Sequence, residues 1–208
     1  MNVVIFGASG RVGSSLVEYC LEKNDSITAC SRNLTNLERF SDKIILKELD
    51  VKNLNSVTQV INKDSIVYSC LSGRNSKPDY SVLSIGIQNM IQAMNQVGSK
   101  RIVIVAGAGI LLDKEFGLRR NRPNYPEIFK MVSAENLIVL DKLKNSNLEW
   151  SILCCPEMPY GERTGKYRIE VDYLPESGNR ISVQDVADAM LNITENKFYF
   201  QKKIGICY

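Results

Sequence analysis

VVIFGASGRVG, residues 3–13, contains an apolar run, a Gly-x-x-Gly-x-x-Gly turn and the start of a helix, in that order. Gly7 permits a tight turn, Gly10 allows the backbone to approach a phosphate, and Gly13 allows the helix to pack closely on the strand. The N–H groups and the dipole at the helix start favour an anion such as a pyrophosphate. The stretch therefore predicts a dinucleotide-binding turn rather than a purely structural one. The residues expected to hold the dinucleotide here are Gly7, Ser9, Gly10, Arg11, Val12 and Gly13.

Short apolar runs alternate with helical patterns along most of the chain. The expected strands are Asn2–Phe6, Ser26–Ser31, Lys43–Leu49, Ser65–Leu71, Arg101–Ala106 and Glu149–Cys154. The expected helices are Arg11–Lys23, Leu54–Asn62, Tyr80–Val97 and Glu127–Lys144. Such alternation predicts an α/β fold, a single Rossmann-type domain over residues 1–208 with a doubly wound, mainly parallel sheet and helices on both faces.

The C-terminal part continues the same sheet. Gly165–Tyr173 alternates like a strand, Ser182 is placed to cap a helix that ends near Asn192, and Phe198–Tyr208 is expected as a closing strand. Three loops, 72–79, 107–126 and 155–164, follow strands. The carboxyl ends of strands are where ligands bind in open α/β sheets, so these loops are expected on the substrate side.

The composition is that of an ordinary globular protein. Apolar residues make up 44% and the net charge is +3, which gives no reason to expect nucleic acid. The six cysteines form no Cys-x-x-Cys pair, so buried thiols are expected and no metal site. The chain has no histidine, which excludes a Ser-His-Asp triad and a His-ligated metal. With no targeting segment and no long apolar run, a cytoplasmic protein with no membrane partner is expected.

The end of the second strand bears on the choice of cofactor. The sequence there is Ala29-Cys30-Ser31-Arg32-Asn33, without the acid that usually holds the ribose 2′-hydroxyl of NAD. Arg32 and Ser31 are suited to a 2′-phosphate, and Arg11 could cover the same phosphate. NADP(H) is therefore preferred as the cofactor, with NAD(H) the alternative if Arg32 is only a solvated loop residue.

Several motifs together resemble a known family. They are residues 7–13, Ser31-Arg32, Leu49-Asp50-Val51, residues 85–94, 146–150 and 165–167, and Ile181–Ala187. This set is similar to the atypical short-chain dehydrogenases/reductases with an NAD(P)H-binding, NmrA-like domain, and within them to the biliverdin reductase B (flavin reductase) type. The glycine motif is specific to the wider superfamily, and the later segments are less specific.

The resemblance implies further site residues. Asp50 and Val51 would border the adenine. The ribose and nicotinamide would be lined by Cys70, Leu71 and Ser72. Ala106 and Gly107 would lie below the nicotinamide, and Cys155 and Pro156 would close its other side.

The catalytic residue is left open by the sequence. Short-chain dehydrogenases commonly use Tyr-x-x-x-Lys, but Tyr125 and Lys130 are five residues apart and Pro126 follows the tyrosine. Tyr125 is therefore only a weak candidate. The glycine-lined segment Gly107–Gly109 would leave room for a flat ring. The residues that could stack on it are Tyr80, Phe116, Tyr125, Met158 and Tyr160.

Two functions from different classes follow. The first is an NADPH-dependent oxidoreductase that transfers a hydride to a small, flat conjugated acceptor such as a flavin or a quinone. The second is a non-catalytic NADP(H) sensor of NmrA-like type that regulates a protein partner. An epimerase of the extended short-chain type is a third and weaker interpretation, because it would need the Tyr/Lys pair.

Overall fold

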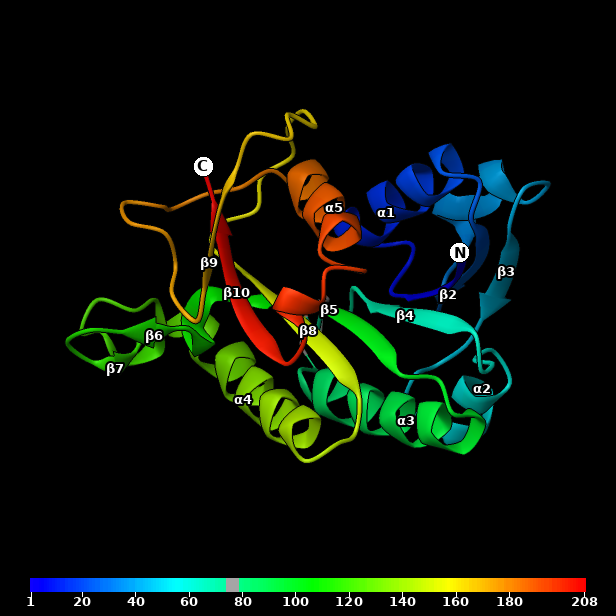
Figure 1. Ribbon diagram of the computed structural model, residues 1–208, viewed down its shortest axis with the longest axis horizontal. Helices are drawn as coiled ribbons and strands as arrows, with labels where there is room; N and C mark the ends of the chain where they lie inside the picture. Colours follow the sequence, from blue (N-terminus) through cyan, green and yellow to red (C-terminus); the bar gives the residue numbers. More distant parts are fainter. Residues whose placement is uncertain (74–78) are drawn as a thin grey trace.

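The computed structural model describes residues 1–73 and 79–208. Its centre is an eight-stranded sheet in the order β3-β2-β1-β4-β5-β8-β10-β9 (Figure 1). The strands are β1 Asn2–Phe6, β2 Ser26–Ser31, β3 Ile45–Glu48, β4 Ser65–Ser69, β5 Arg101–Gly107, β8 Glu149–Cys155, β9 Arg168–Val171 and β10 Lys202–Cys207. Of the expected loop 72–79, residues 74–78 lie outside the described part of the chain.

Every described pairing in this sheet is parallel except the one between β9 and β10. β1 lies between β2 and β4, so the strand order reverses beside it. In a doubly wound sheet this reversal opens a crevice at the carboxyl ends of the strands. The predicted fold class is therefore confirmed, and the C-terminal strands do extend the same sheet.

Helices cover both faces of the sheet, and each face has its own hydrophobic core (Figure 1). α1 (Arg11–Glu22) and α5 (Val183–Asn192) lie on one face, and α2 (Leu54–Thr58), α3 (Ser81–Val97) and α4 (Lys130–Lys144) lie on the other. Along β1, Val3 and Ile5 pack toward α1 while Val4 and Phe6 pack toward α3. This alternation explains why the strand is apolar throughout: both of its faces are buried.

Some expected boundaries were wrong. α2 ends at Thr58 rather than Asn62, because Asn62 lies in a turn in which its side chain accepts from the Asp64 N–H and its own N–H donates to the Ser65 hydroxyl. The closing strand begins at Lys202 rather than Phe198. Before it, Lys197–Tyr199 forms a 3-10 turn in which the Asn196 side chain accepts a hydrogen bond from the Phe198 N–H.

The loop after β5 has a structure of its own. It contains the turn Ala108–Ile110 and a hairpin of β6 (Leu112–Asp113) and β7 (Gly117–Leu118). The Asp113 carboxylate accepts from the N–H groups of Glu115 and Phe116 and pairs with Arg122. A single buried carboxylate therefore closes the hairpin.

The loop after β8 is fastened to the start of α5. Ser182 caps that helix, as expected, by accepting from the Asp185 N–H at 3.0 Å. Asp185 is fully buried, and its carboxylate accepts from the Thr164 N–H and hydroxyl, the Gly165 N–H and the Tyr208 hydroxyl. This network fixes the end of the 155–164 loop.

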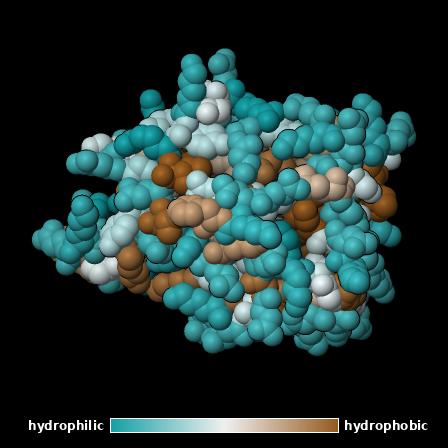
Figure 2. Space-filling view, in the orientation of Figure 1, coloured by the Kyte–Doolittle hydropathy of each residue, from teal (hydrophilic) through white to brown (hydrophobic). Residues whose placement is uncertain are grey.

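The surface shown in Figure 2 carries hydrophobic side chains in small groups among hydrophilic ones. Within residues 1–73 and 79–208, no helix has the length and apolar character needed to cross a membrane.

Candidate functional site

The glycine turn after β1 lies against two neighbouring strands. Gly7 has φ +75°, and a Cβ on it would stand 2.6 Å from the carbonyl oxygen of Cys70 at the end of β4. The N–H groups of Gly7 and Ala8 both donate to the carbonyl of Cys30 in β2, at 3.0 and 3.1 Å. A side chain at position 7 is therefore excluded both by strain and by the neighbouring backbone.

The start of α1 supports an anion site. A Cβ on Gly13 would overlap the Gly7 carbonyl oxygen and come within 2.8 Å of the Ala8 Cα, so the helix packs directly on the turn. Gly10 is the N-cap residue, and no side chain of residues 1–73 or 79–208 caps the helix. The first-turn N–H groups are thus left for a ligand, which is what a pyrophosphate requires.

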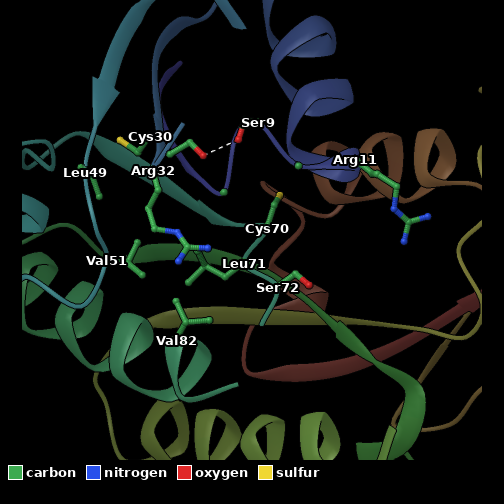
Figure 3. A pocket seen from close by; sticks show the side chains of 13 residues that line it. Ser9, Arg11, Cys30, Arg32, Leu49, Val51, Cys70, Leu71, Ser72 and Val82 are labelled. Atoms are coloured by element: carbon green, nitrogen blue, oxygen red, sulfur yellow. Dashed lines mark hydrogen bonds between the residues drawn. The ribbon is translucent and has the colours of Figure 1, made fainter. Parts of the chain in front are cut away.

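A cavity of about 300 Å³ opens at this turn. Its lining comes from the glycine turn, the ends of β2 and β4, the segment after β3, and α3. The lining residues are Gly7, Ser9, Gly10, Arg11, Cys30, Ser31, Arg32, Leu49, Val51, Cys70, Leu71, Ser72 and Val82. In Figure 3 the Arg32 side chain extends across the cavity toward Val51 and Leu71.

The charged residues that line this cavity are all basic. Arg11 and Arg32 are among its lining residues, and none of them is acidic. The hydroxyls of Ser9 and Ser31 are hydrogen-bonded at 2.6 Å, which links the glycine turn to the residue before Arg32 (Figure 3). The end of β2 and the turn therefore form one polar wall that suits a phosphate.

A second cavity of about 500 Å³ adjoins the first over the start of α1. Its lining residues are Ser9, Gly10, Arg11, Ser14, Asn36, Arg39 and Tyr160. Arg11 donates to the Met158 carbonyl at 2.5 Å and lies over the Tyr160 ring, and Figure 3 shows it directed away from Arg32. Arg11 and Arg32 were expected to cover the same phosphate. In this structure their side chains point apart.

Most of the residues expected near the adenine and ribose line the first cavity. Gly13 lies behind the turn, and Asp50 and Val12 are not among the lining residues. The Asp50 carboxylate instead accepts from the Lys52 N–H at 2.9 Å, so it caps the turn after β3. Three lining residues, Cys30, Leu49 and Val82, were not expected. Cys30 and Leu49 directly precede expected site residues in the sequence, so their neighbours could have indicated them. Val82 could not be found in this way, because its position at the cavity depends on how α3 packs.

The two thiols that line the cavity, Cys30 and Cys70, are protonated and unreactive near neutral pH. Burial raises the pKa of Cys70 far above its ordinary value and raises that of Cys30 to about 12. Because the thiolate is the nucleophilic form, both side chains act as small apolar groups near neutral pH.

The residues expected around the nicotinamide meet at the carboxyl ends of β5 and β8. Gly107 is directly paired with Cys155, and Ala106 with Cys154. None of Ala106, Gly107, Cys155 and Pro156 lines either of the two cavities. Cys155 is buried, and burial raises its pKa well above the ordinary value.

The expected glycine floor is only half open. A Cβ on Gly109 would overlap the Tyr125 hydroxyl and lie 2.9 Å from the Ser133 Cβ, so the tyrosine fills this space. A Cβ on Gly107 would meet only the Asn136 Nδ2, at 3.8 Å. Lys130 is paired with Glu127 at 2.6 Å rather than with Tyr125.

Comparison with known proteins agrees with the interpretation of the glycine turn as a dinucleotide site. A family model described as NAD(P)H-binding matches residues 7–197. This chain belongs to the NAD(P)H-binding family. Its cofactor is therefore a nicotinamide dinucleotide.

Proteins of similar length from several bacteria are similar to this chain. YwnB of Bacillus subtilis (strain 168), an uncharacterized protein, is 24% identical over 207 residues, which cover 94% of this chain and 93% of that protein. An epimerase candidate from Bacteroides thetaiotaomicron is 28% identical, with a TM-score of 0.86 over 100% of this chain and 96% of that one. A candidate NADH-flavin reductase from Streptococcus pneumoniae TIGR4 is 23% identical, with a TM-score of 0.77 over 100% and 99% of the two chains.

Proposed function

We propose that this protein is an NADPH-dependent oxidoreductase that transfers a hydride to a small, flat conjugated acceptor such as a flavin or a quinone. One observation carries the choice of NADPH: Arg32 extends across a cavity that begins at the glycine turn and has no acidic residue among its lining. A guanidinium there pairs well with a 2′-phosphate, whereas NAD sites hold the ribose hydroxyls with an acid.

The residues present fit a dinucleotide. The backbone at Gly7, Gly10 and Gly13 leaves a cradle in which Cβ atoms at positions 7 and 13 would collide with neighbouring backbone. The uncapped N–H groups at the start of α1 would hold the pyrophosphate, and Leu49, Val51 and Val82 supply an apolar wall for the adenine. Ser31 and Arg32 would hold the 2′-phosphate.

The protein would contribute to the reaction mainly by holding the dinucleotide and the acceptor in the right relative position. The bound dinucleotide would supply the hydride, that is, two electrons and one proton. The ends of β4, β5 and β8 would hold the acceptor against it and exclude water from that face. The second proton that a flavin or quinone needs can come from water, so a dedicated acid is not required.

The acceptor class is supported by two points of similarity. The first is the resemblance of the motifs to the flavin reductase type. The second is the name of the Streptococcus pneumoniae neighbour, which designates that protein a candidate NADH-flavin reductase. The backbone at Gly107 is also less crowded than that at Gly109, since a Cβ there would meet only the Asn136 Nδ2, at 3.8 Å.

The epimerase interpretation has a relative in its favour, the Bacteroides thetaiotaomicron protein. Against it, Lys130 is paired with Glu127 and does not support Tyr125. The sensor interpretation fits the same observation, because a protein without the Tyr/Lys pair could bind the dinucleotide and not turn it over.

One experiment separates these functions. Purified protein is mixed with NADPH and with flavin mononucleotide or menadione, and NADPH oxidation is followed by absorbance. Oxidation that depends on both the protein and the acceptor supports the reductase. Tight NADPH binding without oxidation on a broad acceptor panel would replace it with the sensor.

A further inference from the structure

Asn136 occupies an unusual place at the carboxyl edge of the sheet. It lies on α4 in the turn that packs toward β5, and only 4% of its surface is exposed. Its Nδ2 is 3.8 Å from the position that a Cβ on Gly107 would take. Gly107 is the last residue of β5, next to the strand whose end lines the dinucleotide cavity.

The space over Gly107 is bordered by this carboxamide. No other heavy atom of the described chain beyond its immediate neighbours lies within 4 Å of that Cβ position. Two residues further on, the equivalent space over Gly109 is filled by Tyr125 and Ser133. A Cβ would therefore fit at Gly107 and not at Gly109, and Asn136 is the polar group beside Gly107.

The Asn136 carboxamide has no hydrogen-bond partner among the residues that the structure describes. Other buried polar groups nearby do have one. Asn89 of α3 donates to the Val51 carbonyl at 2.8 Å, and the Ser133 hydroxyl donates to the Lys130 carbonyl at 3.1 Å. The fully enclosed polar atoms without a partner among the described residues are Asp25 Oδ2 and Glu135 Oε2, so the Asn136 carboxamide still reaches solvent and is accessible to a ligand.

We propose that Asn136 binds the acceptor: its Nδ2–H donates to a carbonyl oxygen of the flat conjugated ring held over Gly107. The inference rests on the proposed reductase function and names the residue that orients the substrate. When the ring receives a hydride, it gains two electrons and one proton, and negative charge builds on such a carbonyl oxygen until a proton from water neutralises it. A fixed N–H at that oxygen stabilises this charge more than it stabilises the free acceptor.

Stability distinguishes this role from a packing role. Leucine is close to asparagine in size and has no polar atoms. Replacing an amide that makes no hydrogen bond within the protein should therefore change stability little, whereas replacing one that has a partner should destabilise the protein.

The test compares Asn136→Leu with the matched control Asn89→Leu. Thermal unfolding is measured for both variants and the wild type, together with titrations of NADPH and of flavin mononucleotide, the latter by flavin fluorescence. For Asn136→Leu we expect a Tm within about two degrees of the wild type, an NADPH Kd within about twofold, and flavin affinity and kcat/KM reduced about tenfold or more. For Asn89→Leu we expect a lower Tm.

Several results would overturn the proposal. A Tm for Asn136→Leu as low as that of Asn89→Leu would make Asn136 a structural residue, and unchanged flavin affinity would remove it from the acceptor site. Weaker NADPH binding would assign it to the nicotinamide instead. If the wild type binds NADPH and flavin but does not turn over, the reductase fails while the flavin titrations still decide the role of Asn136. A wild type that binds neither ligand would refute both.

Discussion

The hydroxyls of Ser9 and Ser31 lie 2.6 Å apart and join the glycine turn to the end of β2. The next residue after Ser31 is Arg32, whose side chain extends across the same cavity (Figure 3). One hydrogen bond therefore links the part of the site proposed for the pyrophosphate to the part proposed for the 2′-phosphate.

Arg32→Ala should weaken NADPH binding about tenfold to a hundredfold and leave NADH within about threefold. The reason is that charge-assisted hydrogen bonds to the 2′-phosphate are lost, and NADH has no such phosphate. Calorimetric titration of both dinucleotides measures this. Arg180→Ala is the control, because Arg180 is exposed and lines neither cavity. Equal weakening of NADPH and NADH would refute the assignment of Arg32.

Gly10→Ala and Gly13→Ala should have different effects. A Cβ on Gly10 would meet only the Gly7 carbonyl oxygen, at 3.2 Å, so the variant should fold but lose dinucleotide affinity. A Cβ on Gly13 would collide with the turn itself, which should lower the free energy of unfolding by about 1–3 kcal/mol. Urea unfolding and NADPH titration of both variants check this. Equal stability loss at the two positions would contradict it.

Asp185→Asn should remove part of the acid sensitivity of the fold. Burial raises the pKa of Asp185, but the hydrogen bonds from Thr164, Gly165 and Tyr208 outweigh it and hold the pKa below the ordinary value. A lowered pKa means that this carboxylate stabilises the fold fully above about pH 4 and that the stabilisation is lost as pH falls through the folded-state value.

The variant should therefore be about 2 kcal/mol less stable near neutral pH, with the difference shrinking toward pH 3. Urea unfolding of both proteins from pH 7 to pH 3 measures it. A constant difference over that range would show that the charge of Asp185 is not what matters.

Tyr125→Phe should leave turnover within about threefold of the wild type, because the acceptor can take its proton from water. A general acid typically contributes about a hundredfold or more. Initial rates of NADPH oxidation with menadione test this. A fall of a hundredfold would make Tyr125 the proton donor and would replace the water-based account.

The sequence predicts the parallel core well because each strand there is buried on both faces. β1 and β2 have the expected bounds, and the glycine turn, α1 and the capped start of α5 lie where their local signals place them. These features depend on neighbouring residues alone, which is why one sequence is enough to predict them.

Features that depend on distant contacts were missed. The 3-10 turn Thr35–Phe40 contributes Asn36 and Arg39 to the second cavity, and nothing in its local sequence indicates that position. The hairpin of β6 and β7 depends on the burial of the Asp113 carboxylate. Tyr125 occupies the space next to Gly109, although it comes 16 residues after that glycine in the sequence. Local sequence patterns do not predict such a contact.

The measurement that tests the central claim most directly is a titration of the wild-type protein with NADPH and NADH, paired with initial rates of their oxidation by flavin mononucleotide. The account predicts that NADPH binds about tenfold or more tightly than NADH and that its oxidation depends on the protein. Preference for NADH, or absence of binding by both dinucleotides, would contradict it.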